Sequence, residues 1–158
     1  MNDIRNKAER AAVAIATEQQ DLLPPPLTQW WRLTPATAFD LVALIEMRAS
    51  LSKINMLGEP RWKDAAAGDA SASIGVALDM NAGGTVDARF DLVMTALAVC
   101  AAGGNAAACL VMSHILRKIP GAGKGEARIA TSWLVRAFDK VLSHRADAAA
   151  TKVWEAQR

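Results

Sequence analysis

Apolar residues recur every three to four positions along most of the chain, which is the spacing of one face of an α-helix. Prolines and glycines interrupt this spacing and separate the candidate helices. The expected helices span residues 3–20, 34–57, 85–102, 105–119 and 126–158, with a shorter one over 70–81. Long helices with short turns predict an all-α fold, a single-domain helical bundle of about five to six helices. It comprises an N-terminal helix plus a Pro/Trp connector at 1–33 and a bundle core at 34–158.

Residues 73–92 also fit a second interpretation. Apolar residues alternate with smaller or polar ones over 74–80 and again over 86–92, and glycines lie between the two runs, as in a β-hairpin. The second run, however, also has apolar residues at helical spacing, which continue into alanine-rich sequence. These residues are Val86, Phe90, Val93, Leu97 and Cys100. We therefore favour helices, and keep an α+β fold with one β-hairpin at about 73–92 as the alternative.

The helix expected over 34–57 is apolar around most of its circumference. Thr34 and Pro35 form a strong helix start, because a threonine hydroxyl caps free amides and proline suits the first helical position. Gly58 is expected to end the helix. The line that interrupts its apolar surface is narrow and consists of Asp40, Ala43, Glu46, Ser50 and Lys53. This pattern predicts a helix that is central in the bundle or covered by a second subunit.

Three consecutive prolines at 24–26 exclude a helix there and favour a stiff, extended connector over residues 22–33. The connector carries Trp30, Trp31 and Arg32. Consecutive tryptophans on an extended segment point in different directions, so both are not expected to be buried in one small core. Two interpretations follow: one indole covers the bundle as a lid, or the three residues bind a partner, because Trp and Arg are enriched at interfaces.

The 21 residues from Leu92 to Met112 carry no charge and are long enough to cross a bilayer. Their centre, however, is a run of small residues followed by Gly103, Gly104 and Asn105, which lipid does not favour. Two helices joined by a tight turn account for the segment better than a membrane span does.

The composition indicates a folded helical domain, because 52% of the 158 residues are hydrophobic and 33 are alanine. The net charge of +2 identifies no partner, but the charge is unevenly distributed. Residues 114–145 carry seven basic and two acidic side chains, against 11 and 14 in the rest of the chain. We expect a basic patch that contacts nucleic-acid phosphates or an acidic protein surface. Its residues are Arg117, Lys118, Lys124, Arg128 and Arg136.

The segment Pro120–Gly125 resembles the phosphate-binding loop of adenylate kinases, in which glycine amides and a lysine surround a nucleotide phosphate. The resemblance covers six residues. Lys118 stands where such loops have their first glycine, and Gly125 stands where they have a hydroxyl residue for the metal. The preceding residues have helical rather than strand character, so we expect a turn between two helices.

Cys100, Cys109 and His114 are suitable zinc ligands by type, but their spacing matches no compact ligand pair and a fourth ligand is missing. We expect two buried thiols, which are typical of a reducing compartment and predict a cytoplasmic protein. The N-terminal residues are charged and lack the apolar stretch of a signal peptide. We predict no cofactor, no metal site and no catalytic set.

These observations favour a non-catalytic cytoplasmic protein that acts through protein–protein interaction, as a homo-oligomer, an adaptor or a small inhibitor of a larger complex. Trp30, Trp31 and Arg32 are the predicted partner-binding residues. The alternative is a nucleic-acid-associated regulator that contacts phosphates through residues 117–145.

Overall fold

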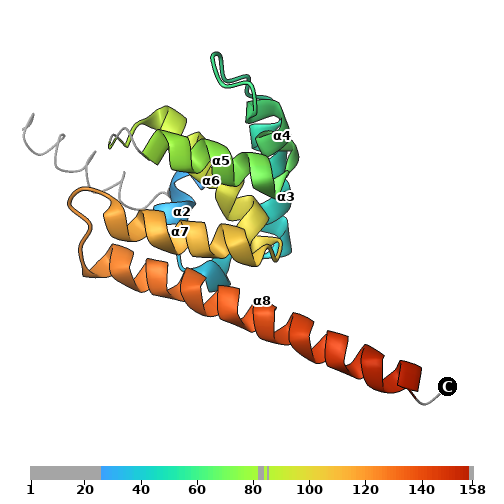
Figure 1. Ribbon diagram of the computed structural model, residues 1–158. Helices are drawn as coiled ribbons and strands as arrows, with labels where there is room; N and C mark the ends of the chain where they lie inside the picture. Colours follow the sequence, from blue (N-terminus) through green and yellow to red (C-terminus); the bar gives the residue numbers. More distant parts are fainter. Residues whose placement is uncertain (1–25, 82–83, 85, 157–158) are drawn as a thin grey trace, which may run out of the picture.

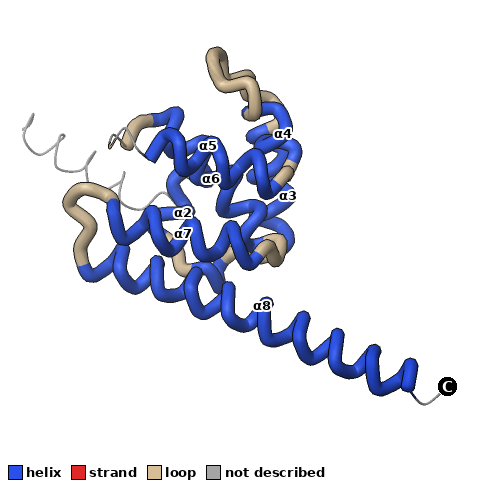
Figure 2. Tube along the Cα trace, viewed as in Figure 1, coloured by secondary structure: helices blue, strands red, loops and turns tan. Residues whose placement is uncertain are grey.

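The computed structural model describes residues 26–81, 84 and 86–156, and every regular element in this part is helical (Figures 1 and 2). The all-α prediction is therefore confirmed, and the alternative hairpin at about 73–92 is wrong, because residues 73–81 and 88–92 are helical. The elements are η1 (Leu27–Gln29), α2 (Trp30–Leu33), η2 (Ala36–Ala38), α3 (Leu41–Leu51), α4 (Trp62–Ala67), α5 (Ala70–Asn81), α6 (Ala88–Ala102), α7 (Ala106–Lys118) and α8 (Lys124–Ala156). The expected helix over 3–20 lies outside the described residues.

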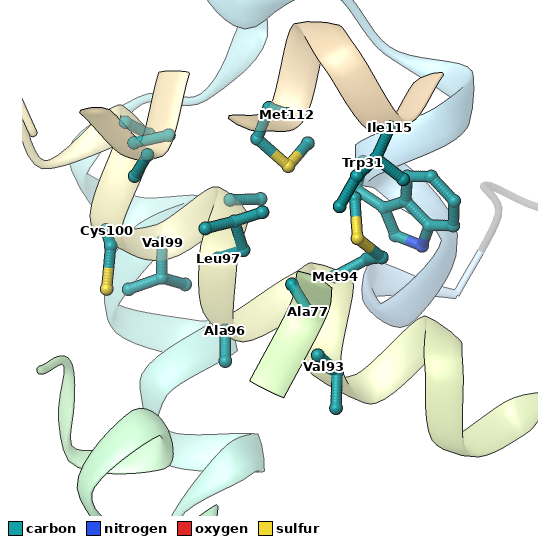
Figure 3. Packing of buried hydrophobic residues seen from close by; sticks show 14 of the residues in the cluster. Trp31, Ala77, Val93, Met94, Ala96, Leu97, Val99, Cys100, Met112 and Ile115 are labelled. Atoms are coloured by element: carbon teal, nitrogen blue, oxygen red, sulfur yellow. The ribbon is translucent and has the colours of Figure 1, made fainter. Parts of the chain in front are cut away.

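Helix α6 is the centre of the bundle. It is buried along almost its whole length, and η1, α2, α3, α4, α5 and α7 all contact it. Its buried alanines leave room for neighbouring helices to approach closely, while Met94 and Leu97 fill the space between them (Figure 3). The prediction that the helix at 34–57 could be the central one is therefore wrong, because α6 takes that place.

Helix α3 is shorter than the sequence predicts and lies at the periphery. Its first turn is capped by Asp40, whose carboxylate accepts a hydrogen bond from the Ala43 amide at 2.8 Å. Thr34 is not the cap: its hydroxyl donates to the Trp30 carbonyl at 2.5 Å and so closes α2. Only one side of α3 faces the core, through Ala43, Met47 and Leu51.

Helices α6 and α7 form the hairpin predicted for residues 92–112. Asp87 caps α6 and Asn105 caps α7, each accepting a backbone amide three residues later. Gly104 adopts a positive φ of 108° in the turn, a conformation that favours glycine. No helix among the described residues is both long and apolar enough to span a bilayer.

Two segments expected to be non-helical contain short helices. Residues 27–33 of the predicted extended connector form η1 and α2, because the prolines exclude a helix only up to Pro26. Residues 62–67, which fall between the helices expected over 34–57 and 70–81, form α4, and Trp62 is buried, with the indole N–H donating to the Ile54 carbonyl at 2.8 Å. Burial of one large aromatic side chain thus stabilises a turn of helix that the alanine-rich sequence permits.

Helix α8 is the longest element and runs without a break over Lys124–Ala156. It packs against α7, η2 and α2 through Ala130, Trp133 and Ala137. The Trp133 ring contacts Phe39, with ring centroids 5.1 Å apart. Beyond these contacts, the C-terminal part of α8 extends past the other helices (Figure 1).

Candidate interaction surface

The structure places Trp31, a predicted partner-binding residue, in the core. Its side chain is 0% exposed and belongs to the same cluster as Met94, Met112 and Ile115 (Figure 3). Its ring meets Phe90 edge-on, with centroids 5.8 Å apart. Trp31 is therefore not accessible to a partner in this structure, and its position corresponds to the lid interpretation.

The neighbours of Trp31 are only partly covered. Trp30 is half-buried and meets Phe39 edge-on at 6.2 Å. Arg32 is also half-buried, and its Nη2 lies 3.2 Å from an oxygen of Asp91. The three consecutive residues thus have different surroundings, because the short helix α2 turns their side chains in different directions.

Asp91 is the centre of a buried polar cluster between α2 and α6. One carboxylate oxygen accepts the Trp31 indole N–H at 3.1 Å, and the other accepts Arg32. Thr95, one turn later, donates to the carbonyl oxygens of Asp91 and Thr28. These hydrogen bonds join the start of the described chain to the central helix, so we assign the cluster a structural role.

The five residues of the predicted basic patch have different local surroundings. Lys118 lines a hollow of about 270 Å³ beside the α5–α6 connection, whereas Arg128 lines two hollows along α8. Arg117 donates to the Thr131 hydroxyl at 3.1 Å, and Lys124 is exposed at the start of α8. Arg117 therefore lies next to the first turns of α8, whereas Lys118 and Arg128 line different hollows.

Arg136 is partly buried and bonded to the backbone. Its Nη1 donates to the Ala36 carbonyl and its Nη2 to the Ala102 carbonyl, both at 2.6 Å. Ala102 ends α6, where the free carbonyls and the helix dipole favour a cation. Arg136 thus ties α8 to η2 and to the end of α6, and its charge is directed into the protein.

Residues 120–123 form a turn between α7 and α8, as the sequence predicts, and Lys124 and Gly125 begin α8. The Gly123 amide donates to a carboxylate oxygen of Glu126 at 2.8 Å. Hydrogen bonds from the backbone amides of Glu126 and Gly123 lower the pKa of that carboxyl. A helix, not a strand, precedes the turn, and the Gly123 amide just before α8 is met by the protein's own carboxylate.

Both cysteine thiols are buried and free. Cys100 on α6 lies 3.5 Å from the Ser73 hydroxyl, and the Cys109 thiol on α7 donates to the Ala101 carbonyl. Burial raises the pKa of both thiols above the ordinary value. The thiolate, which is the reactive form, is therefore disfavoured at both positions.

This raised pKa gives a pH dependence of stability with a definite sign. In the unfolded chain the thiols lose protons near pH 8.5, whereas the folded chain retains them to higher pH. The free energy of unfolding should therefore be unaffected by these groups at neutral pH and should fall as pH rises above about 8.5. Urea unfolding at a series of pH values measures the slope, and the Cys100→Ala/Cys109→Ala variant should lack the thiol part of it. Equal slopes would contradict the burial effect.

A row of large apolar side chains on α8 faces solvent. Val135, Phe138 and Leu142 are 53%, 58% and 61% exposed, although residues of these types are normally buried. Their spacing of three and four residues places them on one face, opposite Trp133 and Ala137. Arg128, Thr131 and Arg145 continue the same spacing and are also exposed. We call these six residues the outer row: Arg128, Thr131, Val135, Phe138, Leu142 and Arg145.

Two shallow hollows adjoin the outer row and share Arg128 and Ser132. One has a volume of about 410 Å³ and lies between α2 and α8, with Leu33, Pro35 and Ile129 in its lining. The other, of about 450 Å³, is lined by Thr131 and Val135 among others. A side chain from a partner on the outer row would therefore find apolar contacts on both sides of Arg128.

A second apolar surface lies on α3, where Leu41, Val42 and Ile45 are 59–72% exposed. The short helix η1 contacts α3. The outer row of α8 is the better candidate, because η1 is not among the elements that make substantial contact with α8.

The sequence contained a signal for the outer row that the prediction did not use. The residues Ala130, Leu134, Phe138, Val141 and Leu142 are apolar and recur at helical spacing in the helix expected over 126–158. The structure splits this set: Ala130 faces the body, whereas Phe138, Val141 and Leu142 face solvent. A search for two separate rows at three-to-four spacing identifies one row through Trp133 and another through Phe138.

Among the described residues, no group of three or more His, Cys, Asp or Glu side chains is placed to hold a metal ion. No protein-family model, no curated protein and no solved structure matches this chain. Its function is therefore inferred from its own residues.

Proposed function

We propose that this chain is a protein-interaction module that binds its partner through the outer row of α8. The proposal rests on Val135, Phe138 and Leu142, which lie in one line along α8 and are each more than half exposed. Soluble proteins rarely leave large apolar side chains aligned on one surface unless another molecule covers them. Burial of such a row against a second helix is a common way in which helical proteins associate.

The surroundings of the row support binding rather than chemistry. The buried ionisable groups that we described serve the fold: Asp91 holds Trp31 and Arg32, and Arg136 holds two backbone carbonyls. Trp133 and Ala137 are buried and anchor the part of α8 that carries Thr131 and Val135. A partner would therefore meet a preformed surface at this end of the row, which lowers the entropy cost of association there.

Replacement of Phe138 by glutamate tests this proposal. Because Phe138 is 58% exposed, the free energy of unfolding of the variant should differ from that of the natural chain by less than about 0.5 kcal/mol. It should lose partner binding by at least about tenfold, because an aromatic anchor is replaced by a charge. Quantitative co-purification from the native cell, with mass spectrometry, compares the variant with the natural chain.

The matched control is Leu110→Glu, because Leu110 is also exposed but lies on α7 outside the outer row. This control should retain the partners that the natural chain captures. If Phe138→Glu retains the same partners in the same amounts, the outer row is not the binding surface.

A further inference from the structure

The outer row is apolar in the middle and positively charged at both ends. Thr131, Val135, Phe138 and Leu142 are the inner members, and arginines occupy the two outer positions. Arg128 and Arg145 are 17 positions apart on one helix, so they lie about 26 Å apart at 1.5 Å per residue. On the basis of the proposed function, we propose that the partner is an acidic amphipathic helix of another protein.

The charges beside the outer row strengthen this inference. The Arg117 guanidinium reaches the Thr131 hydroxyl from α7, which adds a third cation next to the Arg128 end. Asp139 is the one exposed acidic residue of α8 within the span of the row, so cations predominate. The ion pairs among the described residues are made elsewhere, by Arg32 and Arg61. The cations of the row therefore have no carboxylate partner among these pairs.

A second copy of this chain fits the outer row poorly. The positions follow a repeating three-four spacing, so two copies can overlap completely in either direction. A parallel pair places Arg128 against Arg128 and Arg145 against Arg145, whereas an antiparallel pair places Arg128 against Arg145. Both alignments set like charges opposite each other at both ends, which disfavours self-association.

The complementary helix has a defined chemistry. It needs large apolar residues at three-to-four spacing over about 18 residues, in order to cover the inner members of the outer row. It needs a carboxylate near each end, opposite Arg128 and Arg145, where bidentate arginine–carboxylate contact is favourable. Such contacts fix the alignment and raise the association rate, while the apolar contacts supply most of the affinity.

Two synthetic peptides test the inference on the full-length protein. Both are designed as helices of about 18 residues with leucine at the inner row positions, and they carry either glutamate or lysine at the two outer positions. We expect the glutamate peptide to bind about tenfold more tightly at low salt, and the difference to shrink as salt screens the charges. Fluorescence anisotropy of the labelled peptides measures both affinities.

Protein variants then assign the contacts. Arg128→Glu/Arg145→Glu should reverse the preference, so that the lysine peptide binds more tightly. Phe138→Ala should weaken both peptides by about tenfold without changing the preference, whereas Leu110→Ala should change neither affinity. Equal binding of the two peptides, or a preference unaffected by charge reversal, would overturn the inference.

Other molecules bound to the outer row would give different results in these measurements, and each such result would overturn the inference. Self-association that is lost in Phe138→Ala, measured by light scattering, would identify a second copy. Tighter binding of a peptide with the sequence of residues 1–25 would identify the chain's own N-terminal segment. Binding of a DNA duplex that requires Arg128 and Arg145 but not Phe138 would identify phosphates. If neither peptide binds but Phe138→Glu still abolishes partner capture, the proposed function holds and the partner chemistry is wrong.

Discussion

Trp31→Ala is expected to lower the free energy of unfolding by about 4 kcal/mol, a large part of the stability of a domain of this size. The substitution removes a fully buried indole from the contact between α2, α6 and the rest of the core. It also removes the N–H that donates to Asp91, so a buried carboxylate loses one of its two side-chain donors. Urea unfolding monitored by circular dichroism measures the loss.

Two further variants separate the contribution of the Trp31 ring from that of its N–H, and the contribution of Trp31 from that of Trp30. Trp31→Phe keeps a ring next to Phe90 but lacks the N–H, so its loss should lie well below that of the alanine variant. Trp30→Ala removes a half-buried indole and should cost clearly less than Trp31→Ala. Equal, small losses in both alanine variants, with partner binding impaired, would instead restore the tryptophan pair as the binding site.

Asp91→Ala is expected to destabilise the protein by about 3 kcal/mol, because it leaves the Arg32 cation and the Trp31 N–H without their acceptor. The carboxylate is almost fully covered, whereas the Arg32 side chain is 32% exposed, so water can compensate for part of the loss. Asp139→Ala is the matched control, since Asp139 is exposed and its removal should change stability by less than about 0.5 kcal/mol.

A double-mutant cycle measures the interaction energy between Asp91 and Arg32. Arg32→Met removes the cation, and the combined Asp91→Ala/Arg32→Met variant should be less destabilised than the sum of the two single variants. Additive losses would show that Asp91 acts through Trp31 alone.

Local signals in the sequence predicted the central hairpin well. Asn105 as a cap, the glycines of the turn and the uninterrupted apolar spacing all specify α6 and α7 within a few neighbouring residues. The start of α3 was misplaced because two cap signals compete there: Thr34 closes the preceding helix, and Asp40 opens α3. A capping residue alone does not show which of two adjacent helices it serves.

Which side chains of the candidate surface are exposed depends on contacts between residues far apart in the sequence, and the sequence alone does not reveal those contacts. Trp31 finds its acceptor 60 positions away, and this contact decides that it is buried. Helix α8 carries two apolar rows of similar strength, and the contact between Trp133 and Phe39 selects the row that faces the body. Phe138 is exposed as a result of that selection rather than of its own neighbours in sequence.

The length of α8 also has a thermodynamic consequence. Past Ala137, none of its residues with a described side chain is buried, so the helix there depends largely on its own backbone hydrogen bonds. Most helical stability in proteins comes from the packing of an apolar face rather than from helix propensity, so this part of α8 is less stable than its packed part. Opening from the C-terminal end therefore requires much less free energy than global unfolding, and amide hydrogens there exchange first. A ligand that binds this end must offset the free-energy cost of keeping it helical. The stability of the C-terminal turns therefore changes the affinity even where the contacts with the ligand stay the same.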